Sequence, residues 1–415
     1  MSADEEEDSP EPILLAVPAE GVPELTDTPA ALAEVARRFA EGSGPVAVDA
    51  ERASGFRYGQ RTYLAQFKRE GAGIALIDTA ALPDLSALSE ALVNAEWVLH
   101  AASQDLPGLR DLGMEPTSVF DTELAARLLG WPRVGLASVV ERELGFSLAK
   151  EHSAQDWSER PLPPAWLNYA ALDVEVLLDL RERLGEHLEA AGKTEWARQE
   201  FEAVRLSPPA EPRVEPWRRT SGSHLIKDRR SLAIVRSLWE AREADAEARD
   251  IAPGRVLRDA TIVVAAQAQP ATYDALVALR EWQSRGTKRR APQWYTAIQR
   301  AMTLPESELP PARGPRQDGP PLPRSWEEKR PEAAIRLTQA KVVIANLVET
   351  HSVPAENLLQ PDALRRLCWD YEGGGESEVR EFLNERGARA WQIELVAAPL
   401  AQAFATAPAP APAAP

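Results

Sequence analysis

The sequence predicts an α/β domain with a mixed sheet, followed by two small all-helical bundles. In the first half, short apolar segments typical of strands alternate with segments of helical periodicity. In the second half, helical periodicity continues with almost no strand pattern, and two proline-rich stretches interrupt it. We therefore expect a disordered acidic tail (1–23), an α/β domain (24–205), a linker (206–216), a bundle (217–304), a second linker (305–324), a second bundle (325–402) and an Ala/Pro tail (403–415).

The strands and helices of the α/β domain can be placed in order. Val46–Val48 reads as a short buried strand after a Gly-Pro turn, and residues 97–100 read as another strand. Two apolar segments, 63–67 and 74–77, flank a glycine-containing turn and predict a hairpin. The helical patterns cover residues 85–94, 105–112, 121–129, 136–144 and one long stretch from about 164 to 191.

Composition excludes several classes of protein. The 415 residues contain one cysteine, Cys368, so neither an internal disulfide framework nor a cysteine-based zinc site can form within one chain. No apolar run is long enough to cross a membrane. The first residues are acidic, where a secretory signal requires a positive charge and an apolar stretch. We expect a cytoplasmic protein with no membrane partner.

The charge is unevenly distributed along the chain. The formal net charge is −17, which by itself argues against a polyanionic partner. Residues 1–30 carry nine acids and no Lys or Arg, whereas residues 205–300 carry 18 basic and 11 acidic residues. One helical segment is therefore basic within an acidic protein.

Acidic residues recur at three places in the α/β domain. Asp49 and Glu51 end the first buried strand, and their i, i+2 spacing puts both carboxylates on one face. Two carboxylates held together favour a divalent cation between them, although a solvated strand end would have the same sequence. Asp105 follows the next strand, where it could equally be an acid in the first turn of a helix.

The third place is a late helix. Tyr169 and Asp173 are spaced i, i+4 and so share one helical face. Their surroundings, residues 167–180, are mostly apolar, and an acid is costly to bury there unless it is paired or bound to a metal. A Tyr-Asp pair on a solvent-exposed face is the alternative.

The order of these motifs resembles the tyrosine branch of the DEDD superfamily of 3′→5′ exonucleases. The stretch Lys150–Leu162 is similar to the segment that precedes the third motif in ribonuclease D. Phe120-Asp121-Thr122, followed by residues 125–129, is similar to the helix expected after the second motif. The resemblance covers about residues 25–200 and implies a ribonuclease H-like exonuclease domain. It implies that Asp49, Glu51, Asp105 and Asp173 bind two Mg²⁺ or Mn²⁺ ions, and that Tyr169 orients the attacking water.

Further residues are candidates for substrate binding. Gln66 occupies a position at which related enzymes contact the terminal nucleotide, although a glutamine in a strand is more often structural. His100, at a strand end, is expected to have a structural or substrate-contacting role rather than a catalytic one. The basic segment resembles the HRDC domain (helicase and RNase D C-terminal), and Arg229 and Arg230 in it are candidates for contacts with nucleic acid.

The resemblance implies a 3′→5′ exoribonuclease that releases nucleoside 5′-monophosphates during 3′ processing of tRNA or other stable RNA. The last segment resembles a second HRDC-like domain, so the expected fold is the exonuclease domain followed by two HRDC-type bundles. Two alternatives remain open: an exonuclease that acts on single-stranded DNA, and a nucleic-acid-binding scaffold without catalysis. The oligomeric state is left undetermined by the sequence.

Overall fold

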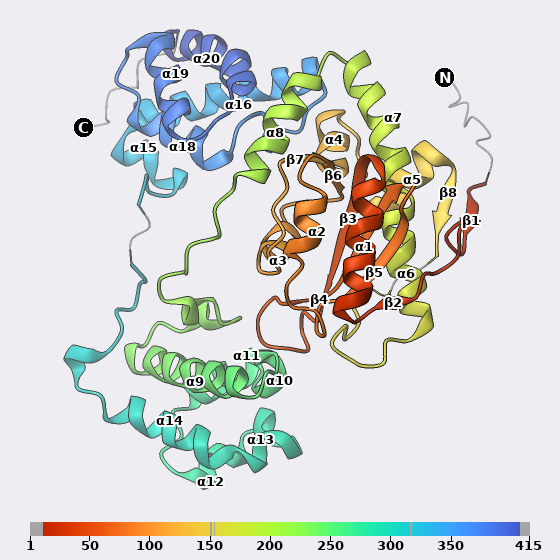
Figure 1. Cartoon of the computed structure of the whole chain (residues 1–415). Coiled ribbons are helices and arrows are strands. Elements are labelled where there is room, and N and C mark those ends of the chain that lie inside the picture. Colours follow the sequence, from red (N-terminus) through yellow and green to blue (C-terminus); the bar gives the residue numbers. More distant parts are fainter. Residues whose placement is uncertain (1–10, 150–151, 153, 316–317, 407–415) are drawn as a thin grey trace.

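The computed structural model describes residues 11–149, 152, 154–315 and 318–406. Figure 1 shows three bodies: an α/β domain, a first bundle that begins at residue 217, and a second bundle that ends at residue 405. The mixed sheet followed by helical bundles confirms the expected fold class. No helix in the described part of the chain is long and apolar enough to cross a membrane.

The α/β domain is built on a six-stranded sheet in the order β2-β5-β4-β3-β6-β7. The central strand β3 is antiparallel to β4 and parallel to β6, and β4 continues antiparallel to β5. A separate parallel pair joins β1 to β8. The strands are β1 (Ile13–Leu15), β2 (Leu25–Thr26), β3 (Ser43–Arg52), β4 (Thr62–Glu70), β5 (Gly73–Asp78), β6 (Glu96–Leu99), β7 (Ser118–Asp121) and β8 (Phe146–Leu148).

Helices cover both faces of this sheet, and the alternation of side chains along β3 shows why. Val46 and Val48 pack on one face with α1 and α2, whereas Ala47 between them packs on the other face with α4 to α8. The helices are α1 (Pro29–Glu41), α2 (Ser86–Ala91), α3 (Leu106–Arg110), α4 (Thr122–Leu128), α5 (Leu136–Leu144), α6 (Pro164–Glu175), α7 (Leu177–Ala190) and α8 (Thr194–Arg205).

Three elements differ from the expected ones. Strand β3 continues through both acids to Arg52, because its whole length pairs with β4. The long helix expected over 164–191 is divided at Val176 into α6 and α7. Residues 11–23 are not a free tail: β1 pairs with β8, and the Asn168 side chain donates to Ala16 O (2.8 Å). Residues 1–10 of that tail, and Lys150, Glu151 and Ser153 of the ribonuclease D-like segment, lie outside the described residues.

Each bundle has its own apolar core. The cores contain Trp282 and Trp294 in the first bundle and Trp326 in the second, all fully buried. The final helix runs to Ala405, beyond the expected end of the second bundle at 402, and residues 407–415 are outside the described part. The helices are α9 (Arg229–Ala248), α10 (Pro253–Val256), α11 (Asp259–Ala268), α12 (Tyr273–Ala278), α13 (Arg285–Arg289), α14 (Ala291–Thr303), α15 (Trp326–Lys329), α16 (Pro331–His351), α17 (Ala355–Leu358), α18 (Pro361–Asp370), α19 (Gly375–Glu385) and α20 (Ala390–Ala405).

The second bundle is fixed to the α/β domain through α8. Glu200, which is 4% exposed, accepts from both Arg389 nitrogens (2.7 and 2.6 Å) and from the Trp391 indole (2.9 Å). Trp391 also stacks on Trp196 at a centroid separation of 4.8 Å. The Glu200 carboxylate of α8 therefore accepts hydrogen bonds from two side chains of the second bundle, Arg389 and Trp391.

Replacing that carboxylate should loosen the interface. Glu200→Ala leaves a largely buried guanidinium and an indole N–H without partners, a loss of about 3 kcal/mol. We expect a lower melting temperature by calorimetry and faster proteolysis at the junction. Glu195→Ala is the matched control, because Glu195 lies on the same helix in an exposed pair with Arg198. Equal melting curves for the two variants would contradict the assignment.

Candidate active site

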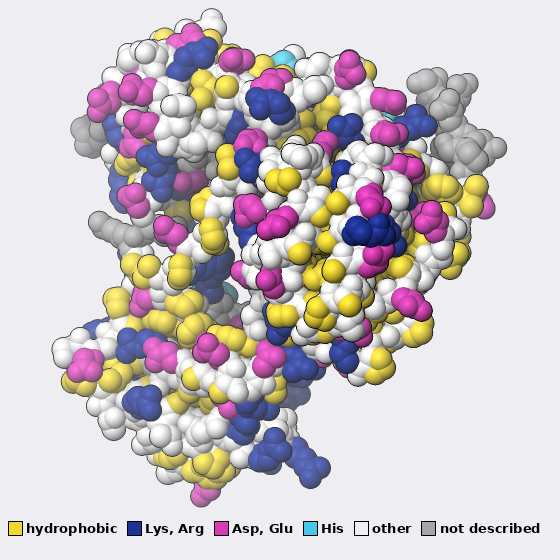
Figure 2. Space-filling model, in the orientation of Figure 1, with side chains coloured by type: hydrophobic (Ala, Val, Ile, Leu, Met, Phe, Trp, Pro, Cys, Tyr) yellow, Lys and Arg dark blue, Asp and Glu magenta, His cyan; other side chains and the backbone are white. Residues whose placement is uncertain are grey.

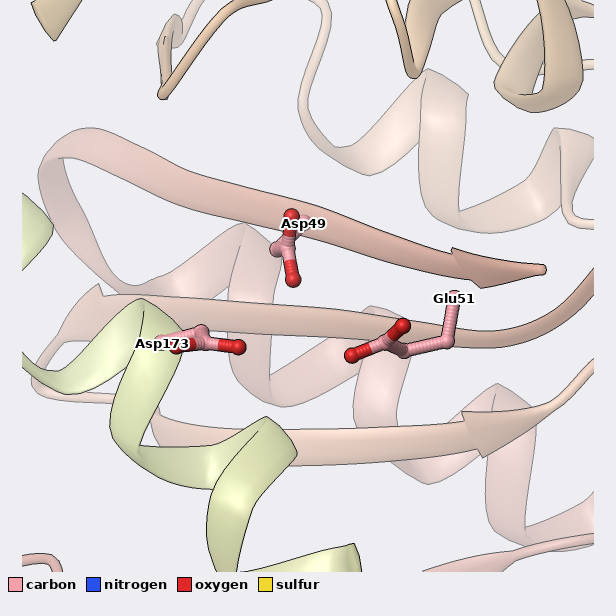
Figure 3. A group of neighbouring side chains, drawn as sticks. All are labelled: Asp49, Glu51 and Asp173. Atoms are coloured by element: carbon pink, nitrogen blue, oxygen red, sulfur yellow. The ribbon is translucent and has the colours of Figure 1, made fainter. Parts of the chain in front are cut away.

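Strand β3 places two carboxylates side by side at its end. Asp49 is opposite Gln66 of β4, and Glu51 is opposite Leu64, so both acids share one face of the sheet. Figure 3 shows their side chains directed into a common space. Glu51 is only 7% exposed, so the pair is not a solvated strand end.

Asp105 reaches the same space from the loop after β6. It occupies the N-cap position of α3, but its side chain makes no capping hydrogen bond. The carboxylate is 6% exposed and faces the Arg52 guanidinium at 3.5 Å. An acid that stabilises a helix end normally accepts hydrogen bonds from the free N–H groups of the first turn. Asp105 does not, so its role is expected to lie in the cavity that it faces.

Helix α6 supplies the remaining residues. Asp173 is directed toward Asp49 and Glu51, and one oxygen of each of the three carboxylates lies within 4.8 Å of the others (Figure 3). Tyr169, one turn earlier, lies on the same face of the helix. The rings of Trp157 and His152 pack against Tyr169, with centroids 6.4 and 5.9 Å away, and hold it in place.

All five residues line one cavity of about 380 Å³. Residues far apart in the sequence thus meet at the end of β3. The wall also includes His100, which was expected near the site, and Arg52, which was not. The lining consists of Asp49, Ala50, Glu51, Arg52, Ser54, His100, Ala101, Gln104, Asp105, Glu123, Leu136, Tyr169, Asp173 and Leu177.

The four carboxyl groups have raised pKa values. Burial is the largest cause for each group, since a charged carboxylate loses its hydration there. Neighbouring carboxylates add to the effect: Asp49, Asp173 and Asp105 all raise the pKa of Glu51. Concentrated negative charge of this kind is unfavourable in the protein alone and becomes favourable beside a cation.

The donor set fits a divalent metal. Carboxylate oxygens are the ligands preferred by Mg²⁺ and Mn²⁺, and the group formed by Asp49, Glu51 and Asp173 includes no thiolate or imidazole that would favour a softer metal. A bound cation would also offset both the lost hydration of these carboxylates and the repulsion between them.

Tyr169 and His100 are both held in their neutral forms. Burial and the nearby carboxylates of Asp173 and Glu51 raise the pKa of the Tyr169 phenol, so its Oη keeps its proton. Burial lowers the pKa of His100 to about 4. The Thr122 hydroxyl donates to Leu99 O (3.2 Å) and lies 2.9 Å from His100 Nδ1, so Nδ1 is the donor and Nε2 is left as an acceptor.

Two residues that support the site were missed from the sequence. Arg52 adds a positive charge to the cavity wall. The only feature of the sequence that could have indicated this is its position directly after Glu51. Asp121 is buried and accepts from the backbone N–H groups of Ala101 (3.1 Å) and Ala102 (2.8 Å). Because Ala101 has a φ of +62°, this carboxylate fixes a strained turn that leads to Asp105.

Gln66, a candidate for substrate contact, does not reach the cavity. Gln66 is fully buried and does not line the cavity, and its amide donates to Asp49 Oδ2 at 3.4 Å. Its opposite position on β4 directs it toward Asp49, so it orients a carboxylate instead of reaching a nucleotide.

Arg229 and Arg230 also differ from their expected role. Arg229 donates to the carbonyls of Glu306 (3.0 Å) and Leu309 (2.8 Å), and Arg230 donates to Leu304 O (2.6 Å). Both guanidiniums therefore bind the start of the second linker to α9. Leu309 in that linker is buried in the first bundle, so residues 305–310 pack against it and do not act as a free spacer.

The fold and its family models define the class of protein. Residues 23–189 match the family model described as "3'-5' exonuclease", and the acidic cavity lies within that range. Residues 231–298 match "HRDC domain", and residues 319–404 match "3' to 5' exonuclease C-terminal domain". The protein is a 3′→5′ exonuclease, and its second bundle matches a model different from that of the first.

Comparison with individual relatives defines the family. The chain is 32% identical over 314 residues to ribonuclease D of Granulibacter bethesdensis, covering 72% of this chain and 74% of that one. It is 28% identical over 380 residues to ribonuclease D of Escherichia coli K12, covering 89% and 94%. The chain belongs to the ribonuclease D family.

Solved structures agree with this assignment. A crystal structure of a protein from Bifidobacterium adolescentis superposes with a TM-score of 0.87 at 42% identity, covering 95% of this chain and 100% of that one. Escherichia coli RNase D superposes with a TM-score of 0.65 at 26% identity, covering 92% and 98%. The similarity thus extends over the bundles as well as the α/β domain.

Neutralising one carboxylate should stabilise the protein in the absence of divalent ions. A folded-state pKa above the ordinary 4.5 means that the folded protein holds the Glu51 proton more tightly than the unfolded chain, so stability falls as the pH rises above that value. Glu51→Gln removes this effect, and we expect a gain on the order of 1 kcal/mol at neutral pH in EDTA.

The measurement is thermal unfolding in EDTA at several pH values. The advantage of Glu51→Gln over the parent should grow as the pH rises from about 4.5 toward neutrality. Glu90→Gln, on the exposed face of α2, is the matched control and should show no such trend. A parent protein more stable than Glu51→Gln in EDTA at neutral pH would be inconsistent with repulsion in the cavity.

Proposed function

We propose that this chain is a metal-dependent 3′→5′ exoribonuclease of the ribonuclease D type, which hydrolyses the terminal phosphodiester and releases nucleoside 5′-monophosphates. The observation that carries the proposal is the meeting of Asp49, Glu51, Asp105 and Asp173 with Tyr169 on one cavity wall. The Escherichia coli relative is described as "an exoribonuclease involved in structured RNA processing", which supports structured RNA, such as tRNA precursors, as the substrate class.

The four carboxylates would hold the metal, with Mg²⁺ and Mn²⁺ as the ions that suit oxygen ligands. When bound, two such ions would activate a water molecule and stabilise the negative charge of the departing 3′ oxygen. Asp49, Glu51 and Asp173 form the tightest group, and Asp105 closes the set from the opposite loop.

The other residues of the cavity act on the substrate. Tyr169 Oη, which keeps its proton, donates a hydrogen bond toward the attacking water or the scissile phosphate, instead of removing a proton. Arg52 places a positive charge beside Asp105, where it can offset phosphate charge. His100 offers Nε2 as an acceptor for a sugar hydroxyl or base N–H group.

The first bundle offers a basic surface that leads toward this cavity. A hollow of about 740 Å³ lies between α10, α11 and α13, and Figure 2 shows Lys and Arg side chains gathered over this end of the bundle. Arg258 and Arg289 are exposed, and neither forms an ion pair with any residue that the structure describes. The hollow, in place of Arg229 and Arg230, is our candidate for binding the RNA backbone. Its arginines are Arg249, Arg255, Arg258, Arg289 and Arg290.

A single-stranded DNA substrate and a scaffold without catalysis are the alternatives. No specific contact among the described residues of the cavity favours DNA, and the complete set of carboxylates argues against a scaffold. RNA is preferred because the family to which the chain belongs is named for that substrate.

Removing the central carboxylate should abolish hydrolysis. Asp49→Ala takes away a ligand shared by the acidic group, and we expect the rate to fall by at least about a thousandfold while the fold is retained. The assay follows 5′-labelled RNA and DNA of one sequence with Mg²⁺, Mn²⁺ or EDTA, and far-ultraviolet circular dichroism checks the fold.

The outcomes separate the three functions. A ladder of shortened RNA with metal and none with EDTA supports the proposal, whereas faster shortening of DNA selects the first alternative. Silence of the parent protein on both substrates with either metal leaves the scaffold. Glu123→Gln is the control, since Glu123 lines the cavity rim but pairs with Arg127 at 2.6 Å.

Removing two arginines of the hollow should weaken binding without slowing cleavage. For Arg258→Ala combined with Arg289→Ala we expect KM to rise about tenfold, kcat to stay constant, and the slope of log KM against log salt to fall by about 1 to 2. Arg300→Ala, on an exposed face of α14, is the matched control. An unchanged salt slope in the double variant would exclude the hollow as the RNA-binding surface.

A further inference from the structure

The connection between β3 and β4, residues 53–61, lies between the acidic cavity and the first bundle. It begins directly after Arg52, and Ser54 within it lines the cavity. Ser54 is held by a hydrogen bond of its hydroxyl to Gln60 Oε1 (3.0 Å). A change in the shape of this connection would therefore change the wall of the cavity.

The first bundle binds the outer side of the connection through backbone atoms. The turn between α9 and α10 donates from Ala252 N to Phe56 O at 2.9 Å. Arg255 donates from Nε to Gly55 O at 2.7 Å and stacks its guanidinium 4.0 Å from the centroid of the Phe56 ring. These contacts fix the path of the main chain.

Asp250 completes the contact with its side chain. One carboxylate oxygen accepts from the backbone N–H of Tyr58 (3.2 Å), and the other lies 3.6 Å from an Arg57 guanidinium nitrogen. Asp250 itself has a φ of +49°, a left-handed conformation that aspartate and asparagine tolerate better than most residues. The residue type thus suits both the backbone and the contact at the point where the bundle meets the connection.

Arg57 extends the contact to the other side of the cavity. Its Nε donates to Ser158 Oγ at 2.6 Å, and the Ser158 hydroxyl in turn bonds Asp156. Trp157, between these two residues, packs against Tyr169. One guanidinium therefore links the bundle to the connection after β3, which lines the cavity through Ser54, and to the segment before α6, which packs against Tyr169.

The contacts of Arg57 and Asp250 contribute more to the position of the connection than to the free energy of unfolding. The Arg57 and Asp250 side chains are 39% and 54% exposed, and an ion pair at that exposure contributes little to folding. By contrast, Asp250 is the only hydrogen-bond acceptor of the Tyr58 N–H among the described residues, and the Arg57–Ser158 bond joins the connection to the segment before α6.

We infer that Asp250 and Arg57 are positioning residues, through which docking of the first bundle sets the geometry of the catalytic cavity. The bundle then contributes to the rate of bond cleavage itself, separately from any RNA that it binds. The inference rests on the proposed exonuclease function.

The test compares two substitutions at Asp250 in the full-length protein. Asp250→Gly removes the hydrogen-bond acceptor and the ion pair while glycine adopts the same backbone conformation freely, and we expect kcat on saturating single-stranded RNA to fall about tenfold with KM nearly constant. Asp250→Asn keeps an acceptor for the Tyr58 N–H and tolerates the backbone conformation, so it should recover most of the parental kcat.

Hydrogen–deuterium exchange gives a readout that does not depend on activity. Peptides covering residues 53–61 should exchange faster in Asp250→Gly than in the parent, because the Tyr58 N–H loses its acceptor. The control Glu240→Gln, on the exposed side of α9, should change neither kcat nor exchange.

The results distinguish this inference from the proposed function. An inactive parent protein would overturn the proposed function, whereas exchange in residues 53–61 would still report the docking contact. An active parent with an unchanged kcat in Asp250→Gly would overturn the inference alone. A rise in KM with constant kcat would also overturn it, because that pattern belongs to the RNA-binding hollow.

Discussion

The structure depends on holding four buried carboxylates together against their mutual repulsion. Burial, which removes the hydration of the charged carboxylates, is the largest cause of the raised pKa values of Asp49, Glu51, Asp105 and Asp173, and repulsion from neighbouring carboxylates adds to it for the last three. The sheet ladder overcomes this repulsion at β3, where pairing with β4 fixes Asp49 and Glu51 on one face. A long ladder of backbone hydrogen bonds is well suited to impose such a geometry, because it does not depend on the side chains that it positions.

The remaining carboxylates are fixed by contacts that lie outside the cavity. The turn that leads to Asp105 is held by the buried Asp121 carboxylate, which accepts from three backbone N–H groups. Asp173 is held by a helix whose residues Ala170, Ala171 and Val174 are buried in the core of the domain. The connection after β3 is the weakest side of the site, since it is an irregular loop. The first bundle binds this loop, so a second folded body supports the part of the cavity that the sheet leaves least constrained.

The sequence was sufficient for the fold class, and the five residues that it proposed for the chemistry line one cavity. Period and residue type are local properties, so residue spacing alone assigns the i, i+2 acids to one face of a strand and the i, i+4 pair to one face of a helix. Residue spacing does not predict which residues far apart in the sequence contact each other. Residue type alone could not reveal that Arg229 and Arg230 bind the carbonyls of Leu309 and Leu304. Nor could it reveal that Gln66 is enclosed beside Asp49, or that residues 13–15 pair with β8.

Contacts between distant groups also decide which charged side chains are available to a partner. The surplus of basic residues in 205–300 suggested one continuous binding surface, but many of those guanidiniums are used inside the protein. Arg242 is buried against Asp259, and Arg218 bonds Glu215 and the linker carbonyl of Pro311. Among the described residues, arginines without such partners, including Arg258 and Arg289, are the ones available to a polyanion, and both lie at the end of the bundle that contacts the catalytic domain. The positions of Arg258 and Arg289 therefore predict where RNA would approach. Neither the net charge of −17 nor the surplus of basic residues in 205–300 predicts that place.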